Sequence, residues 1–194
     1  MSKVAVVYFS GYGHTKVIAE KIQEGICMNS ITCDLFDVTE LGTAVEKLND
    51  YDGIIFGAPT YMGSVPWQFK KFMDDSSKVW FQQGWKNKLA AGFTNSHSLS
   101  GDKFNALIQL VTFAAQHSML WMPLGISSAA SDTQSDIKNL TEMNRVGSSL
   151  GLMAQSDDGS PVKTPPEGDR KTAVKFGERF AQQVLKNQSN HPVE

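Results

Sequence analysis

The chain has 194 residues, 41% of them hydrophobic and 20% charged, which is an ordinary composition for one globular domain. Its 18 basic and 20 acidic residues give a net charge of −2 and favour neither nucleic acid nor an anionic membrane as a partner. No run approaches the roughly 20 apolar residues of a membrane span, and we expect no signal peptide before the first predicted strand. We expect a cytoplasmic domain over residues 1–187 and a flexible tail over 188–194.

The thiol content of the chain is limited to Cys27 and Cys33. Their spacing matches no zinc-binding pattern, and two thiols provide no disulfide framework. We therefore expect two reduced core cysteines and no metal site.

Residues 4–15 have the pattern of a strand, a loop and the start of a helix. A β-branched apolar run over residues 4–9 breaks into Ser10-Gly-Tyr-Gly-His-Thr15, and a helical pattern begins at Lys16. This order gathers backbone N–H groups, two hydroxyls and a helix N-terminus around one point, which attracts a phosphate. A tight turn capped by Ser or Thr is the alternative interpretation.

The same loop lacks two common nucleotide-binding motifs. It contains no Gly-x-x-x-x-Gly-Lys-Ser/Thr, and Lys16 stands at the third glycine position of Gly-x-Gly-x-x-Gly. A mononucleotide phosphate held by Ser10, Thr15 and backbone amides, without a counter-cation, fits this composition better.

Strand and helix patterns alternate along the rest of the chain. Strands are predicted over 31–38, 53–57, 88–94 and 119–125, and Pro123 places the last at a sheet edge or at an early strand end. Helices are predicted over 16–26, 43–49, from Pro66 onward, over 101–117 and over 167–186. Residues 126–165 are rich in Ser, Asp, Gly and Asn, with a short strand or turn at 145–154, and so long an irregular segment is usually functional or mobile.

This alternation predicts an α/β fold, because strands joined through helices pair in parallel by right-handed crossovers. We expect a flavodoxin-like three-layer sandwich with a five-stranded parallel sheet in the order 2-1-3-4-5. Ligands of such sheets bind at the carboxyl ends of the strands, beside the switch point at strand 1. Loops over residues 10–15, 58–66 and 94–101 are therefore predicted to meet there.

The second and third loops complement the first. Two prolines stiffen residues 58–66, Gly63 permits close approach of a ligand, and Tyr61 and Met62 offer a surface to an aromatic ring. Residues 94–101 are dense in groups that suit the polar edge of a heterocycle. Each loop alone could be an ordinary turn or solvated loop, but together they describe an FMN site. Its predicted contacts are Ser10, Gly11, Tyr12, Gly13, His14, Thr15, Pro59, Thr60, Tyr61, Met62, Gly63, Thr94, Asn95, Ser96, His97 and Gly101.

These loops carry a resemblance that covers nearly the whole chain. Ser10-Gly-Tyr-Gly-His-Thr15 is similar to the phosphate loop of flavodoxin-like NAD(P)H:quinone oxidoreductases of the WrbA type and of the related NADPH-dependent FMN reductases. Ala58-Pro-Thr-Tyr-Met-Gly63 resembles their Pro-Thr-Arg-Phe-Gly loop, and His117-Ser-Met119 resembles their His-Gly-Met. Tyr61 in place of arginine, His97 in place of a small residue and Asp102 in place of glycine are departures from the family pattern.

The resemblance implies FMN as cofactor, NADH or NADPH as co-substrate, a small quinone-like acceptor, and a homodimer or homotetramer. Two electrons would pass as a hydride through flavin N5 in a ping-pong reaction. His117 is the residue expected in the acceptor pocket, where it would hydrogen-bond or protonate the acceptor. A polar residue that closes its helix is the alternative for His117.

Two other classes of function remain open. One is a flavodoxin that transfers single electrons, although the weak net charge and the long 126–165 segment count against it. The other is a cofactor-free binding or regulatory protein of the same fold. Arg145 is expected either to pair with a nicotinamide-nucleotide phosphate or to be an ordinary surface residue, whereas core or subunit contacts are expected for Trp80, Trp85 and Trp121.

Overall fold

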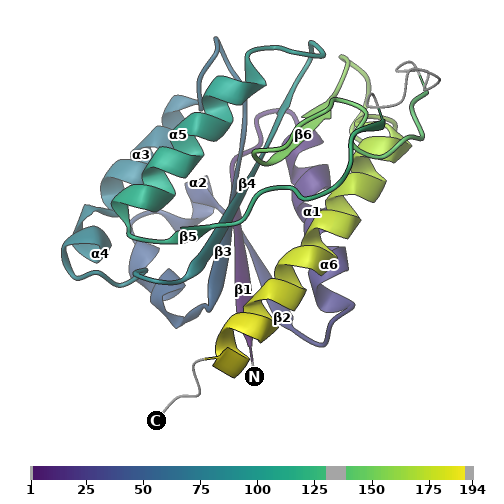
Figure 1. Cartoon of the computed structure of the whole chain (residues 1–194). Helices are drawn as coiled ribbons and strands as arrows, with labels where there is room; N and C mark the ends of the chain where they lie inside the picture. The colour runs from purple at the N-terminus through teal and green to yellow at the C-terminus, as the bar shows by residue number, and fades with distance from the viewer. Residues whose placement is uncertain (1, 130–138, 191–194) are drawn as a thin grey trace.

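Residues 2–129 and 139–190 are described by the computed structural model, in which helices cover both faces of a parallel sheet (Figure 1). The strands are β1 (Lys3–Tyr8), β2 (Thr32–Asp37), β3 (Gly53–Pro59), β4 (Leu89–Ser96), β5 (Leu120–Trp121) and β6 (Leu152–Gln155). The helices are α1 (His14–Cys27), α2 (Val38–Leu41), η1 (Val45–Asp50), α3 (Trp67–Asp75), α4 (Ser77–Phe81), α5 (Lys103–Gln116) and α6 (Glu167–Asn190). The strand order β2-β1-β3-β4-β5 confirms the predicted flavodoxin-like fold.

Two short strands share the fifth position in the sheet. β5 pairs with the start of β4, where Leu120 lies opposite Leu89, and β6 pairs with the end of β4, where Leu152 lies opposite Phe93. The chain between β5 and β6 is therefore an insertion into one edge strand, and the sheet has six strands instead of the expected five. Pro123, which cannot donate a ladder hydrogen bond, follows closely after the short β5.

The core lies on both sides of the sheet because side chains alternate along each strand. In β1, Val4 and Val6 pack in the cluster formed with α1 and α6, whereas Ala5 and Val7 pack in the cluster formed with α3 and α5. The aromatic residues of the second cluster include Trp85, which is fully buried as expected of a core tryptophan.

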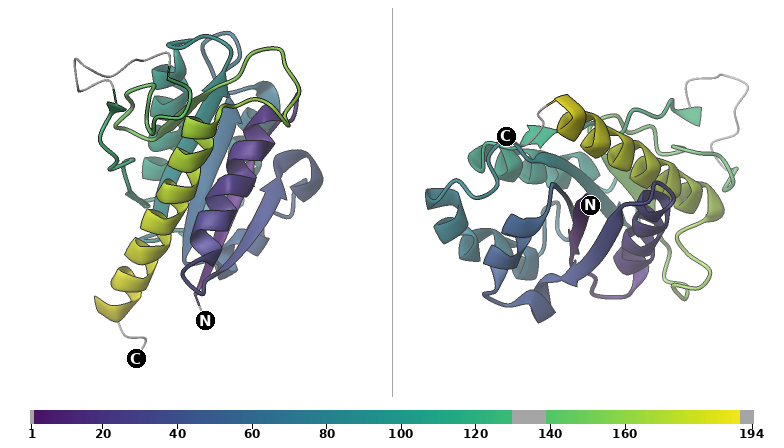
Figure 2. Two further views of the ribbon diagram at one scale, coloured as in Figure 1. Left: turned by 90° about the vertical axis from the view of Figure 1, so that its right-hand side faces the viewer. Right: turned by 90° about the horizontal axis from the view of Figure 1, so that it is seen from below.

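Helices α1 and α6 lie side by side along the sheet (Figure 2) and require glycine where they touch. A Cβ at Gly25 would lie 1.9 Å from the carbonyl oxygen of Val174, and one at Gly177 would lie 2.1 Å from that of Ile22. Any side chain at either position would force the helices apart. This contact fixes the position of α6, whose first turn reaches the carboxyl edge of the sheet.

Several local predictions differ from the structure. The short helix predicted over 43–49 is the 3-10 helix η1 over Val45–Asp50, whereas α2 and α4 were not expected. Gly42, with a φ of 56°, ends α2 before η1 begins. Cys33 is buried as predicted, but Cys27 at the end of α1 is exposed. α6 continues beyond the expected domain end at residue 187, and residues 191–194 of the predicted tail lie outside the described residues.

None of the helices in residues 2–129 and 139–190 has the length and apolar character needed to cross a membrane.

Candidate functional site

The carboxyl ends of β1, β3 and β4 open into a cavity of about 610 Å³. This volume lies within the range of about 300–1,000 Å³ that small-molecule sites occupy. Parts of all three predicted loops line it together with a fourth segment, residues 156–161. The lining residues are Ser10, Tyr12, His14, Thr15, Pro59, Thr60, Tyr61, Asn95, Ser96, His97, Ser156, Asp157, Asp158, Gly159, Ser160 and Pro161.

The first loop presents hydrogen-bond donors to this cavity. Ser10 Oγ accepts hydrogen bonds from the backbone N–H groups of Gly13, at 3.1 Å, and of Lys16, at 3.2 Å. Its lone pairs are therefore occupied, and its own proton remains available to a ligand oxygen. Thr15 is only 2% exposed and lines the cavity, and its hydroxyl has no hydrogen-bond partner within residues 2–129 and 139–190. The N-terminus of α1 adds unpaired backbone N–H groups at the same place.

Two glycines let the other walls close on this loop. Gly13, the N-cap of α1, has a φ of 90°, and a Cβ there would lie 2.8 Å from Cγ of Pro161. A Cβ at Gly11 would lie 2.5 Å from the hydroxyl oxygen of Tyr61. Gly11 and Gly13 thus shape the cavity although neither is among its lining residues.

The second loop turns sharply between Tyr61 and Ser64. The N–H of Tyr61 donates to the carbonyl of Ser64 at 2.9 Å, and the N–H of Ser64 donates back at 3.1 Å. Met62 and Gly63 at the tip have φ values of 49° and 75°, which define a type I′ turn. The turn presents Tyr61 to the cavity, whereas Met62 is fully exposed at the tip and, like Gly63, does not line the cavity.

The third loop rests on buried hydrogen bonds. The hydroxyls of Thr94 and Thr60 lie 2.8 Å apart, and the hydroxyl of Ser156 donates to Oδ1 of Asn95 at 2.9 Å. Gly101, with a φ of 54°, leaves no room for a Cβ, which would lie 2.3 Å from Ser96 Oγ. Thr94 and Gly101 therefore support the loop from behind, and Asn95, Ser96 and His97 line the cavity.

Sequence reasoning did not identify the fourth wall, residues 156–161. Arg170 in the first turn of α6 holds this segment and its continuation. Its Nε donates to the carbonyl of Pro165 at 2.7 Å, and its Nη2 donates to those of Pro161 and Val162 at 2.9 and 3.0 Å. His14 Nε2 lies 2.8 Å from the carbonyl oxygen of Gly159. The signal for this wall was a cluster of Ser, Asp, Gly and Pro directly after the short strand β6.

The structure does not bring His117 to the cavity. His117 follows α5 and precedes β5, so it lies at the amino edge of the sheet, where Leu120 pairs with Leu89 at the start of β4. Asn95 and Ser96 lie at the other end of β4, roughly 20 Å away at about 3.3 Å per residue. The predicted role in an acceptor pocket beside the flavin is therefore corrected, because the loop that enters a parallel strand lies opposite the ligand edge.

The surroundings of His117 are those of a structural residue. Its side chain is 4% exposed, its Nε2 lies 2.9 Å from Ser76 Oγ, and its ring centroid is 4.2 Å from that of Trp85. Burial lowers the pKa of His117 from 6.5 to about 4. His117 is therefore a neutral, largely buried residue that closes α5, and it borders a separate cavity of about 470 Å³ between α3, α4 and α5.

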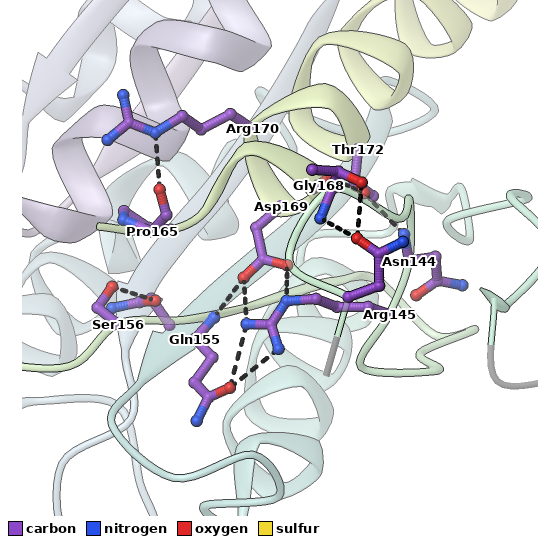
Figure 3. Close-up of polar contacts among 12 residues, drawn as sticks. Asn144, Arg145, Gln155, Ser156, Pro165, Gly168, Asp169, Arg170 and Thr172 are labelled. Carbon is purple, nitrogen blue, oxygen red and sulfur yellow. Dashed lines mark hydrogen bonds and ion pairs between the residues drawn. The ribbon is translucent and has the colours of Figure 1, made fainter. Parts of the chain in front are cut away.

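Arg145 is neither an ordinary surface arginine nor a phosphate ligand. Its Nε lies 2.9 Å from Oδ1 of Asp169 and its Nη2 donates to Oδ2 at 3.1 Å, with both side chains almost fully buried (Figure 3). Gln155 Oε1 accepts from Nη1 and Nη2 at 3.1 Å each, and Gln155 Nε2 donates to the carbonyl of His97 at 2.9 Å. This network connects the inserted segment to the third loop.

The donor set of the cavity fits FMN. Hydroxyls and backbone N–H groups gather at residues 10–15, and no lysine or arginine is found among the described residues that line the cavity. A phosphate bound there would be held by neutral donors and by the helix N-terminus. The structure offers no alternative metal centre in its described ranges, because they contain no group of three or more His, Cys, Asp or Glu that could hold an ion.

Comparisons with known proteins agree with this geometry. Residues 5–129 match the model of the flavodoxin domain family. Flavodoxin FldP of Pseudomonas aeruginosa (strain UCBPP-PA14) is 43% identical over 93% of this chain and 96% of its own. An NAD(P)H dehydrogenase (quinone) of Chromohalobacter salexigens is 28% identical over 96% of this chain and 98% of its own. The solved structure of a flavodoxin, WrbA-like protein from Agrobacterium tumefaciens, is 40% identical, matches 96% of this chain and 99% of its own, and has a TM-score of 0.71.

Proposed function

The chain belongs to the flavodoxin family, and we propose that it is an FMN-dependent electron-transfer protein with its cofactor in the cavity at the carboxyl ends of β1, β3 and β4. Membership in this family implies FMN, which supplies the electron chemistry when it is bound. The observation that carries the proposal is the set of free donors at residues 10–15, placed on a cavity of suitable size.

Different residues of the cavity would bind different parts of FMN. The hydroxyls of Ser10 and Thr15 and the first N–H groups of α1 would hold the phosphate. Tyr61 on one wall and Asn95 and Ser96 on another would position the ring system. The wall at residues 156–161 would exclude water from the side that faces α6.

Two observations support an electron carrier over a quinone reductase, and a third removes an objection to the carrier. The relative named flavodoxin is 43% identical, whereas the quinone dehydrogenase is 28% identical. His117, which was expected in the acceptor pocket, lies at the opposite sheet edge. The 126–165 segment had counted against a carrier, yet residues 156–161 of that segment form a wall of the proposed cofactor site.

Two-electron reduction of a quinone-like acceptor by NADH or NADPH is the second candidate. It is favoured by the quinone dehydrogenase relative, which aligns with 96% of the chain. The predicted homodimer or homotetramer belongs to this candidate, and sedimentation of the purified protein tests it.

One set of measurements on the FMN-loaded protein separates the two candidates. We expect the apoprotein to bind FMN tightly and an anaerobic reductive titration to resolve two separate one-electron couples. Neither NADH nor NADPH should reduce the bound cofactor at a useful rate. Rapid reduction by a nicotinamide followed by reoxidation by quinones would establish the reductase instead, and a protein that does not bind FMN would contradict both candidates.

A further inference from the structure

Lys103, a buried lysine behind the third loop, has no part in the function described so far. We propose that Lys103 is a fixed positive charge that makes the cavity bind reduced FMN more tightly, relative to oxidised FMN, than it otherwise would. The inference rests on the proposed function, because it concerns FMN bound in that cavity.

The contacts of Lys103 place its ammonium group next to the cavity wall. The residue is fully buried, and its Nζ donates to the carbonyl of Ser98 at 2.6 Å and to Oγ of Ser96 at 3.1 Å. Ser96 and His97 line the cavity. One layer of loop residues therefore separates the charge from a bound ligand, and low-dielectric protein instead of water fills the space behind it.

The position of Lys103 is unfavourable for folding, which indicates that a lysine is present there for function and not for stability. It is the first residue of α5, where the helix dipole disfavours a cation. A fully buried lysine without a carboxylate in direct contact is rare, because burial penalises the charged form. Proteins keep such local conflicts mainly at functional sites.

The surrounding charges leave a positive excess. Asp169 on α6 and Arg145 in the inserted segment are the charged groups that act on Lys103. The carboxylate of Asp169 is already engaged by the guanidinium of Arg145 and by the backbone N–H of Gln155, at 2.8 Å (Figure 3). Two cations and one carboxylate leave one net positive charge in the interior.

This excess charge matters when electrons enter the cavity. Reduction of bound FMN by two electrons and one proton adds one negative charge to the cavity. An attraction between that charge and the ammonium group stabilises the reduced cofactor. This stabilisation is the same whichever electron donor reduces the cofactor. Because the ammonium group is fully buried, solvent screens this attraction less than it would screen an attraction between two surface charges.

The charge can also be removed without a mutation. Burial lowers the pKa of Lys103 from 10.5 to about 8; Asp169 opposes this shift, whereas Arg145 adds to it. Lys103 is therefore charged below pH 8 and becomes neutral above it, in a range where the protein can be studied.

The test compares three variants. Lys103→Met removes the charge and both hydrogen bonds, whereas Lys103→Gln removes the charge and keeps a donor for the third loop. Lys88→Met is the matched control. Lys88 is partly buried and, like Lys103, donates to backbone carbonyls, here those of Asn49 and Tyr51, but it lies at the amino end of β4.

The dissociation constants of oxidised FMN and of anaerobically reduced FMN are measured for each protein between pH 6.5 and 9.5. We expect the preference for reduced over oxidised FMN, the ratio of the two dissociation constants, to fall roughly tenfold in both Lys103 variants at pH 7. This is the order of magnitude for the loss of a unit charge that one layer of residues separates from the cofactor. A tenfold fall lowers the two-electron midpoint potential by about 30 mV. After correction for the titration of free FMN, the preference of the wild-type protein for reduced FMN should fall above pH 8. The Lys103 variants should not show this fall.

An equal loss of affinity for both redox forms would show that Lys103 only supports the loop, and would overturn the inference. So would an unchanged preference in Lys103→Gln, or the same fall in Lys88→Met. If Lys103→Met does not fold, Lys103→Gln and the pH series of the wild-type protein decide the matter. Failure of the wild-type protein to bind FMN would overturn the proposed function as well, whereas normal binding with an unchanged preference overturns only the role of Lys103.

Discussion

The two ends of β4 hold similar polar side chains in opposite settings. At the amino end, Lys88 donates to two backbone carbonyls. His117 borders a separate cavity there, but its side chain is only 4% exposed and packs against Ser76, Trp85 and Phe113. At the carboxyl end, Ser96 and its neighbours face a cavity with free hydroxyls on the opposite wall. The role of a polar residue is therefore indicated by the end of the parallel strand at which it lies, and not by its residue type.

The hydrogen bonds around His117 also determine its tautomer. The Ser76 hydroxyl donates to the carbonyl of Met73 at 2.7 Å, so Ser76 Oγ accepts the proton of His117 Nε2. Nδ1 of His117 is consequently unprotonated, and it is buried without a hydrogen-bond partner among the described residues. This environment stabilises the neutral ring, as expected of a residue that packs and does not exchange protons.

Thr15→Glu should have the largest effect at the carboxyl end. A carboxylate about 4 Å from a phosphate costs about 4 kcal/mol at the effective dielectric constant of a protein surface, which is roughly a thousandfold loss of FMN affinity. Quenching of flavin fluorescence measures the affinity. Thr43→Glu is the control, because Thr43 is exposed and does not line the cavity, and equal affinities in the two variants would refute the phosphate assignment.

His117→Gln should affect stability but not FMN. The folded-state pKa of about 4 lies below the ordinary 6.5, so the unfolded chain takes up the proton first as the pH falls. Stability contributed by the neutral ring is present above pH 6.5 and is lost toward pH 4, by about 3 kcal/mol.

Denaturant unfolding at pH 7 and pH 4 measures this effect. The pH-dependent loss should be about 3 kcal/mol smaller in His117→Gln than in the wild-type protein. Its FMN affinity should stay within about twofold of the wild-type value, since His117 lies at the far edge of the sheet. A large fall in FMN affinity would mean that the two ends of β4 are coupled.

Arg170→Met should have an intermediate effect on the cavity. Arg170 donates to the carbonyls of Pro161, Val162 and Pro165. Loss of these bonds should loosen the wall at residues 156–161 and weaken FMN binding by about 1.5 kcal/mol, or roughly tenfold.

Arg179→Met provides a matched control on the same helix. Arg179 also donates to a proline carbonyl, that of Pro123, at 2.7 Å, but this residue lies outside the cavity. Calorimetric FMN titrations of both variants test the comparison. An equal loss in the two variants would show that α6 stability, and not the wall, controls binding.

Tyr61→Phe should have the smallest effect. The Tyr61 hydroxyl lies over Gly11, and desolvation by burial raises the pKa of Tyr61. The hydroxyl is thus neutral throughout the useful pH range, and its removal leaves the ring in place. We expect a change in FMN affinity below about threefold, or about 0.6 kcal/mol, and a larger loss would show that the hydroxyl itself binds the cofactor.

Much of the fold was predictable from the sequence because local patterns report local structure. The β-branched runs and the helical periodicity predicted the strand order β2-β1-β3-β4-β5 and located the three loops that meet at one edge. The split of the fifth strand was not predictable, because Leu120 and Trp121 are too few to form a pattern and their partners in β4 are distant in sequence.

The site shows the same limit. Ser10 and Thr15 follow directly after a clear strand, and the structure places both on the cavity. The wall at residues 156–161 depends on Arg170 and on the helix contact at Gly25 and Gly177, which only the tertiary structure reveals. The family resemblance led to the prediction that His117 lies in the acceptor pocket. That prediction did not consider that the preceding helix, α5, ends at the amino edge of the sheet.

The central claim, that FMN binds at the carboxyl end of β4 and not at its amino end, is tested most directly by amide NMR. Titration of the ¹⁵N-labelled apoprotein with FMN should shift the N–H signals of Gly11, Thr15 and Gly159. The signals of Lys88, His117 and Ser118 should stay in place. Shifts at the amino end with an unchanged first loop would contradict the account.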